Sequence, residues 1–248
     1  MTGVGARAPR TAMVLAAGLG TRMRPLTDDR PKALVEVGGK ALIDHMLDRL
    51  VAAGVETAVV NVHYFADRLE THLARRAAAG LGPRIVISDE RPMALETGGG
   101  LKTALPLLGA GPVWVANIDA VWIGPELDAA QALARAWDPE RMDVCLLLAP
   151  TAGALGFHES GDVFLGDDGR IRFKAPGEAA PWLYVGLHIC RPQIVADGPD
   201  GPFSLTPVWR RLAQAGRVGG AVSPGTWMHV GDPAAREVAQ ARLRAEAG

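Results

Sequence analysis

The sequence has only two cysteines, no excess of charge of either sign and no long apolar run. Cys145 and Cys190 lie in apolar segments without a C-x-x-C motif or a spaced histidine, which argues against a disulfide framework and a zinc site. With 26 Lys and Arg against 27 Asp and Glu, the net charge of -1 gives no general attraction to nucleic acid or anionic membranes. No stretch approaches the roughly 18 apolar residues of a membrane span, and residues 1–10 lack the apolar core of a signal peptide. We therefore expect a cytoplasmic protein that binds neither nucleic acid nor membrane.

Apolar runs alternate with segments of helical periodicity along the first 150 residues. The run at residues 12–17 ends at Gly18 and Gly20, which is typical of a buried strand that enters a tight turn. Repeated strand and helix units predict a doubly wound, mostly parallel α/β sheet, whose ligands bind at the carboxyl ends of the strands. The other expected strands are residues 57–62, 84–88, 113–116 and 143–149, and the expected helices are residues 42–51, 67–79, 99–108 and 125–137.

The pattern changes after about residue 150. The sequence Gly-Asp-Asp-Gly at 166–169 lies between two short expected strands, 163–165 and 170–173, and indicates a β-hairpin. No flexible linker divides the chain, so we expect one domain over residues 1–248 with a small antiparallel β appendage. The remaining expected elements are strands at 183–190 and 218–222 and helices at 205–215 and 234–245.

The segment after the first strand has the composition of an anion-binding site. Gly18 and Gly20 follow the strand, but the third glycine of a dinucleotide-binding fingerprint and the Gly-Lys-Ser/Thr of a Walker loop are both missing. What remains is a turn whose backbone N–H groups can face an anion, with the cations Arg22, Arg24 and Lys32 close behind. This combination predicts a polyphosphate site, whereas any two of these features alone describe a tight turn with solvated charges.

Residues 15–27 read LAAGLGTRMRPLT and are followed by Pro31 and Lys32. Together they resemble the signature of the sugar-phosphate nucleotidyltransferases, which join a nucleoside triphosphate to a sugar 1-phosphate. The ETGGGL segment and the short length are most similar to bacterial N-acetylmuramate 1-phosphate uridylyltransferases of cell-wall recycling, with mannose-1-phosphate guanylyltransferases as close competitors. Further family segments occur in the family's order over nearly the whole chain: Glu96–Leu101, Asn117–Asp119, Phe173–Pro176, Tyr184–Gly186 and Trp227–Gly231.

The resemblance implies a Rossmann-like fold with a nucleotide-binding part at about residues 11–150 and a sugar-binding part at about residues 151–248. It implies that the backbone of residues 15–20 contacts the base and ribose and that Arg22 binds the β and γ phosphates. The glycines at 98–100 are expected to let the backbone approach the base at a helix N-terminus. The implied nucleotide-binding residues are Leu15, Ala16, Ala17, Gly18, Gly20, Thr21, Arg22, Glu96, Thr97, Gly98 and Gly99.

Two further groups of residues complete the implied site. Asn117 and Gly186 match sugar-binding positions. Lys174 matches the lysine of the family's Glu-Lys-Pro segment only in part, and we expect it either to reach the sugar phosphate or to be an exposed hairpin lysine. The residue that reads the base edge stays open, because Asp89 and Glu90 are equally well explained as solvated loop charges.

The resemblance implies a divalent metal ion bound by Asp119, a hard carboxylate ligand that suits Mg²⁺; the alternative is that Asp119 caps the end of a strand. The family usually has a second aspartate ligand where this sequence has His229. The site therefore uses one carboxylate, or uses Asp232, or holds a softer ion such as Mn²⁺ or Zn²⁺ with His229 as a ligand. A buried, hydrogen-bonded His229 is the alternative that the sequence leaves open.

The expected reaction is in-line attack of a sugar 1-phosphate oxygen on the α-phosphorus, with loss of pyrophosphate and no covalent enzyme intermediate. A non-catalytic nucleotide-sugar sensor that has lost its second metal ligand is the rival. The expected partners are a nucleoside triphosphate and a sugar 1-phosphate, and the chain is expected to be a monomer or a small homo-oligomer. The residues expected to offset the moving charge are Arg22, Lys32, Asp119 and Lys174.

Overall fold

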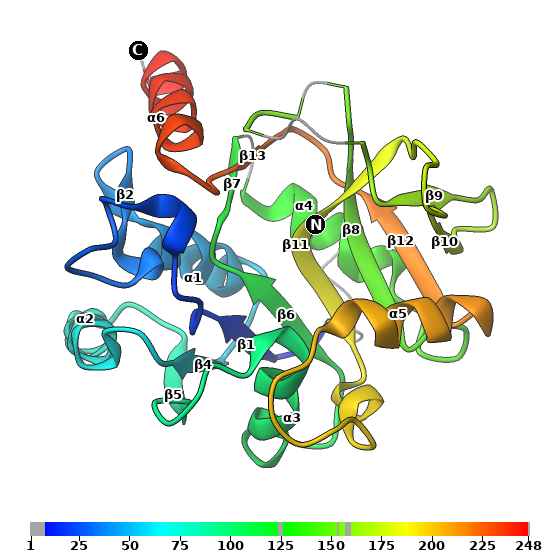
Figure 1. Cartoon of the computed structure of the whole chain (residues 1–248), viewed down its shortest axis with the longest axis horizontal. Helices are drawn as coiled ribbons and strands as arrows, with labels where there is room; N and C mark the ends of the chain where they lie inside the picture. The colour runs from blue at the N-terminus through cyan, green and yellow to red at the C-terminus, as the bar shows by residue number, and fades with distance from the viewer. Residues whose placement is uncertain (1–7, 124–125, 153, 157–159, 248) are drawn as a thin grey trace.

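The computed structural model describes residues 8–123, 126–152, 154–156 and 160–247, and a nine-stranded sheet runs through it (Figure 1). In one half of the sheet, β1 (Thr11–Leu15) lies between β4 (Thr57–Val62) and β6 (Val113–Asn117). β5 (Arg84–Asp89) pairs with β4 at the edge, and all four strands are parallel. Their carboxyl ends therefore lie along one side of the sheet.

The other half contains the antiparallel strands. β11 (Trp182–Cys190) pairs antiparallel with β6 and with β8 (Val144–Pro150), and β12 (Val218–Val222) pairs parallel with β8. β9 (Val163–Leu165) joins the start of β11 and forms the expected hairpin with β10 (Ile171–Phe173). The predicted class, a mostly parallel sheet with a small antiparallel appendage, is confirmed, and a strand from the later part of the chain lies inside the sheet.

Helices cover both faces of this sheet, as a doubly wound fold requires. Neighbouring side chains on a strand point to opposite faces, so Val14 of β1 packs in the core that contains α1, α2 and α4, while Met13 packs in the core that contains α3 and α5. No helix in the described part of the chain is both long and apolar enough to cross a membrane. The helices are α1 (Leu42–Ala52), α2 (Ala66–Ala78), α3 (Glu96–Leu108), α4 (Glu126–Ala136), α5 (Leu205–Gln214) and α6 (Pro233–Ala247).

Four short strands were not predicted. β7 (Ala120–Ile123) and β13 (Thr226–His229) pair as an antiparallel ribbon, and β2 (Glu36–Val37) pairs with β3 (Lys40–Ala41). The helix expected from residue 125 begins at Glu126 in the structure, and Pro125 lies outside the described residues. The ribbon joins segments about 100 residues apart, so local sequence pattern carries little signal for it.

Candidate active site

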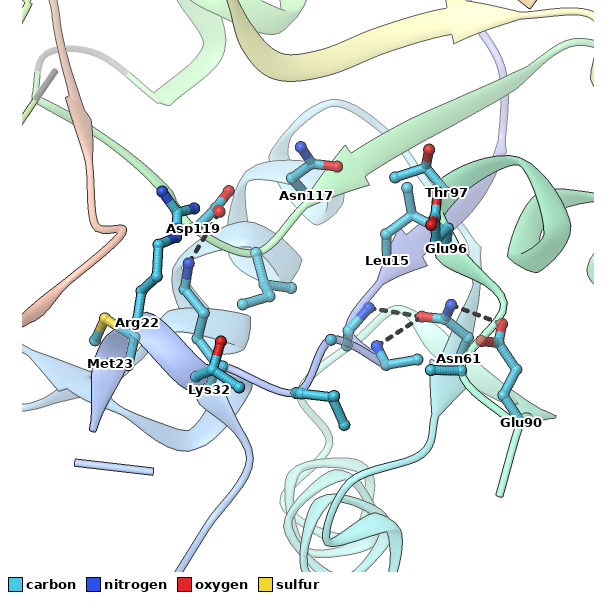
Figure 2. Close-up of a pocket in the computed structure, with 18 of the residues that line it drawn as sticks. Leu15, Arg22, Met23, Lys32, Asn61, Glu90, Glu96, Thr97, Asn117 and Asp119 are labelled. Carbon is cyan, nitrogen blue, oxygen red and sulfur yellow. Dashed lines mark hydrogen bonds and ion pairs between the residues drawn. The ribbon is translucent and has the colours of Figure 1, made fainter. Parts of the chain in front are cut away.

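A cleft of about 470 Å³ opens at the carboxyl ends of the parallel strands. Figure 2 shows Arg22, Lys32 and Asp119 at one end, and Leu15, Glu96 and Thr97 with two buried polar residues at the other. The lining cations Arg22 and Lys32 thus lie at the same end of the cleft as Asp119, whereas Glu90 and Glu96 lie at the other end. Of the residues that the sequence places in the site, the cleft is lined by Leu15, Ala16, Ala17, Gly18, Gly20, Thr21, Arg22, Lys32, Glu96, Thr97, Asn117 and Asp119.

The loop after β1 is shaped by Gly20. Its φ is +63°, which a residue without a side chain adopts readily, and a Cβ there would lie 3.1 Å from the side chains of both Thr27 and Lys32. The Thr27 hydroxyl donates a hydrogen bond to the Gly20 carbonyl over 2.9 Å. A 3-10 helix, Thr21–Met23, follows at once and is anchored by the fully buried Met23. This tight turn places Arg22 in the wall of the cleft.

Two N–H groups of the loop already have a partner inside the protein. The N–H groups of Ala16 and Ala17 donate to Oδ1 of Asn61, over 2.6 and 3.1 Å. These two N–H groups therefore face Asn61 and not an anion, whereas the anion site was predicted at the turn formed by Gly18 and Gly20. Asn61 was missed because its side chain gave no motif; the available signal was an amide within the apolar run 57–62, now seen to be buried at the end of β4.

Lys32 and Asp119 form an ion pair, with 2.9 Å between Nζ and Oδ2 and side chains 13% and 23% exposed. Burial raises the pKa of the Asp119 carboxyl, but the charge of Lys32 and the nearby His229 ring lower it by more, so the pKa lies below its ordinary value. Asp119 is therefore ionised at neutral pH and can hold a cation. The two residues are 87 positions apart in the sequence and meet only because β1 and β6 are neighbours.

His229 ends β13 and pairs with Ala120, next to Asp119. The Val230 N–H donates to the Asp119 carbonyl over 2.8 Å. The His229 ring lies over Gly231, where a Cβ would collide with Nε2, and is tilted against Trp227 at 5.9 Å. Burial lowers the pKa of His229 and Asp119 acts in the opposite direction, so the ring is mainly neutral at pH 7.

Asp232 is not among the residues that line the cleft. Its side chain is exposed, and Oδ1 accepts a hydrogen bond of 2.8 Å from the Ala235 N–H, so it caps the N-terminus of α6. The structure therefore gives no support to Asp232 as a substitute metal ligand. Within the described residues, no group of three or more His, Cys, Asp or Glu side chains is placed to hold a metal ion.

Asn117 and Gly186, the two residues predicted to bind the sugar, lie side by side in the structure. Gly186 has a φ of +83° at a register shift in β11, and a Cβ there would lie 3.2 Å from the Asn117 Cβ. A side chain at position 186 would therefore press on Asn117. Because Asn117 also lines the cleft, this glycine leaves room at the cleft wall nearest β11.

Gly98 and Gly99 have a different role from the one expected. Their N–H groups donate to the Phe203 carbonyl over 2.7 and 3.2 Å, and neither residue lines the cleft. A Cβ at Gly98 would overlap the Phe203 ring, and one at Gly99 would overlap the Gly201 carbonyl. These glycines let the loop before α5 pack closely against α3. At these two positions the backbone of α3 therefore approaches this loop of the protein, and not a base in the cleft as expected.

Three other predicted side chains are not among those that line the cleft. Lys174 follows β10, and its Nζ donates to the Ser160 hydroxyl over 2.6 Å. Arg24 is exposed and forms an ion pair with Asp28 at 3.6 Å. Asp89 is exposed and bonded to Arg91, whereas its neighbour Glu90 is buried and lines the cleft.

Comparison with known proteins agrees with this geometry. Residues 12–156 match the model of the MobA-like NTP transferase domain. The chain is 71% identical to the N-acetylmuramate alpha-1-phosphate uridylyltransferase of Caulobacter vibrioides over 96% of this chain and 98% of that protein. It is 36% identical to the enzyme of that name from Neisseria meningitidis over 93% and 96%. A crystal structure of a UDP-glucose pyrophosphorylase with UDP-glucose shares the fold, with a TM-score of 0.77 at 17% identity over 96% and 99% of the two chains. The chain thus belongs to the sugar-phosphate nucleotidyltransferases that carry the MobA-like NTP transferase domain.

Proposed function

We propose that the chain joins UTP to N-acetylmuramate 1-phosphate, giving UDP-N-acetylmuramate and pyrophosphate. The observation that carries the chemistry is that Arg22 and Lys32, the cations in the lining of the cleft, lie with Asp119 at one end of it. A nucleoside triphosphate matches this arrangement, with its phosphates at the end that contains these cations and its base at the other. The choice of UTP and of N-acetylmuramate 1-phosphate is supported by the 71% identity to the uridylyltransferase of Caulobacter vibrioides.

In the proposed reaction, an oxygen of the sugar 1-phosphate forms a bond to the α-phosphorus while the bond from that phosphorus to the β-phosphate oxygen breaks. The electron pair leaves with pyrophosphate, so charge accumulates on the leaving group. Arg22 and Lys32 lie at the same end of the cleft as Asp119, where they offset that charge. The side chains of the site align and neutralise the reactants, and the chemistry requires no side-chain nucleophile.

The donor set at Asp119 fits a divalent ion that is held largely by substrate. One ionised carboxylate faces the cleft, and Mg²⁺ is commonly bound through one or two carboxylates together with phosphate oxygens and water. Asp119 would hold the ion, and the ion would neutralise phosphate charge when bound. The neutral ring of His229 beside Asp119 is a softer donor, which supports use of Mn²⁺ as well as Mg²⁺.

We also propose that Lys174 contacts the sugar phosphate. Its Nζ donates to the hydroxyl of Ser160 over 2.6 Å and to the carbonyl of the same residue over 3.2 Å, so it must exchange these bonds to reach a phosphate. A phosphate oxygen is a stronger acceptor for an ammonium than a hydroxyl, which favours that exchange.

A pyrophosphate-release assay tests the proposal, with each nucleoside triphosphate measured against a panel of sugar 1-phosphates. We expect the highest kcat/KM for UTP with N-acetylmuramate 1-phosphate. Preference for GTP and mannose 1-phosphate would contradict the substrate assignment while retaining the reaction. Nucleotide binding without turnover of any pair would contradict the reaction itself and support a sensor.

A further inference from the structure

A buried polar pair lies in the wall of the cleft, at the end away from Asp119. Asn61 lies near the end of β4, beside the loop, and Glu90 directly follows β5. Both residues are only 2% exposed, and both line the cleft (Figure 2). Burial of an amide and a carboxyl is costly unless each is hydrogen-bonded, so their partners indicate why they are there.

The hydrogen bonds of Asn61 allow one orientation of its amide. Oδ1 accepts from the N–H groups of Ala16 and Ala17, and Nδ2 donates to Oε1 of Glu90 over 2.8 Å. The two backbone groups are donors, so the oxygen must face them and the NH₂ group must face the carboxylate. Glu90 therefore determines which way the Asn61 amide points, and through it the position of the loop backbone.

Glu90 also holds the opposite wall of the cleft. Its Oε2 accepts a hydrogen bond of 3.3 Å from the N–H of Leu95. The next residue, Glu96, has a φ of +59°, an unusual conformation for a side-chain-bearing residue, and it starts α3 and lines the cleft. A strained turn of this kind persists only where its surroundings hold it.

The space around the pair is closed by Gly100 of α3. A Cβ at this position would lie 2.8 Å from Oε1 of Glu90 and 2.9 Å from Nδ2 of Asn61. The pair thus connects the ends of β1, β4 and β5 with the start of α3 in one packed unit. We call these two residues the Asn61–Glu90 brace.

We propose that the Asn61–Glu90 brace positions the two walls of the nucleoside end of the cleft, the loop at 16–17 and the turn at 95–96, before the nucleotide binds. The inference rests on the proposed function in taking this cleft as the nucleoside triphosphate site. The brace acts through backbone and not on the reacting phosphates. Its loss should therefore weaken nucleotide binding much more than it lowers kcat at saturating substrate.

Exchange of the two polar groups gives a sharp test. Asn61→Asp places two carboxylates against each other, and Glu90→Gln presents an NH₂ group to either Nδ2 of Asn61 or the N–H of Leu95. In the double variant Asn61→Asp/Glu90→Gln every bond can form again: the Asp oxygens accept from the loop and from the Gln NH₂ group, and the Gln oxygen accepts from Leu95. A positioning role of the brace predicts rescue, whereas direct contact of Glu90 with the nucleotide does not.

The readout is the Kd of UTP measured by calorimetry without sugar phosphate, together with kcat and KM for UTP and a thermal melt. We expect each single variant to raise Kd and KM roughly 10- to 100-fold with kcat reduced less than about 3-fold, and the double variant to return within about 3-fold of the original Kd. Ser88→Ala is the matched control. Ser88 is buried and pairs with Asn61 in the register of β4 and β5. Its hydroxyl is one of the buried polar groups of the described residues that have no hydrogen-bond partner.

Unchanged binding of UTP in both single variants would overturn the proposed role of the Asn61–Glu90 brace. So would a double variant that is stable but binds as weakly as Glu90→Gln. If the single variants fail to fold, Gly100→Ala tests the same contact by pressing on both side chains, with Gly111→Ala as its control because a Cβ there meets nothing within 4 Å. Gly100→Ala with unchanged Kd would then refute the proposal. Because nucleotide binding is measured alone, a wrong sugar assignment would leave this test unaffected.

Discussion

At the scale of single residues, Asp119 is bonded to two segments that are distant from it in the sequence. Its carboxylate pairs with Lys32 and its carbonyl accepts from Val230. We expect Asp119→Ala to lower kcat by at least about 100-fold, roughly 3 kcal/mol, because the reacting phosphates lose their cation site. Steady-state kinetics check this, with Asp232→Ala as control. That variant should lose about 1 kcal/mol of stability at the cap of α6 and keep its turnover.

Near-normal turnover of a folded Asp119→Ala protein would show that the metal assignment is wrong. A loss of turnover in Asp232→Ala equal to that in Asp119→Ala would instead restore Asp232 as a ligand. The two carboxylates differ in surroundings, since one faces the cleft and the other is exposed at the start of α6.

The cations near the loop divide into two kinds. Arg22 and Lys32 line the cleft, whereas Arg24 is paired with Asp28 on the surface. We expect Arg22→Ala and Lys32→Ala to lower kcat more than they raise KM for the sugar phosphate, because their contacts strengthen as pyrophosphate departs. Arg24→Ala should keep both constants within about 2-fold, as is usual for an exposed ion pair. Initial-rate kinetics that show only a raised sugar KM for Arg22→Ala would contradict this role.

Most cleft residues could be predicted because the loop signature is continuous in sequence. Two features of the site could not be predicted in this way. The bond from Asn61 to the loop depends on β4 lying next to β1, and the displacement of Gly98 from the cleft depends on a loop about 100 residues later. A run of glycines indicates that another group packs closely against the backbone, but it does not show whether that group belongs to a ligand or to the protein.

At the scale of elements, α3 is positioned by its close contact with the loop before α5. A Cβ at Gly98 would overlap the ring of Phe203 and would lie 2.8 Å from the Phe203 carbonyl oxygen. We expect Gly98→Ala to cost about 1–3 kcal/mol of stability and to weaken UTP binding, because the helix start that carries Thr97 must shift. Thermal melts and calorimetry check this, with the exposed Thr103→Ala on the same helix as control.

A Gly98→Ala protein with an unchanged melting temperature would show that the loop moves away at little cost. If stability falls while UTP binding is unchanged, the helix start is not coupled to the cleft. Both measurements are needed, because the substitution also favours helix formation by up to about 1 kcal/mol.

The main strands and helices could be predicted from periodicity, since each has a continuous buried face. α1 shows this well: its buried residues recur at helical spacing, Leu42, Ile43, Met46, Leu47 and Leu50. β7 has only four residues and follows β6 after a short turn, so its apolar residues could not be separated from the preceding strand. Its partner β13 carries His229, and the pairing is non-local.

At the scale of the whole molecule, a buried histidine links stability to pH. His188 of β11 is fully buried, and its Nδ1 is hydrogen-bonded to the Tyr184 hydroxyl at 2.7 Å. Burial lowers its pKa to about 3, so the folded protein binds fewer protons than the unfolded chain below the ordinary value of about 6.5. Stability from this residue is therefore present above that value and lost as the pH falls, by roughly 1 kcal/mol per pH unit between pH 6 and 4.

We expect His188→Gln to be less stable at pH 7 but to lose less of its melting temperature between pH 7 and pH 5 than the unchanged protein. Cys190→Ala on the same strand is the control. Burial raises the pKa of that thiol, so it stays uncharged between pH 5 and pH 7. The variant should therefore lose as much of its melting temperature over this range as the unchanged protein. Parallel melting curves for His188→Gln and the unchanged protein would show that other groups cause the acid loss.

The position of β11 in the sheet also limits which changes of sequence the fold can accept. It comes from the part of the chain after residue 150, yet it lies between β6 and β8 in the centre of the sheet. A recombination that exchanged that part for the equivalent of a relative would replace a central strand, and the new side chains would have to pack against two unchanged neighbours at once. New sugar preferences in this fold are therefore more accessible through single substitutions around the cleft than through exchange of halves.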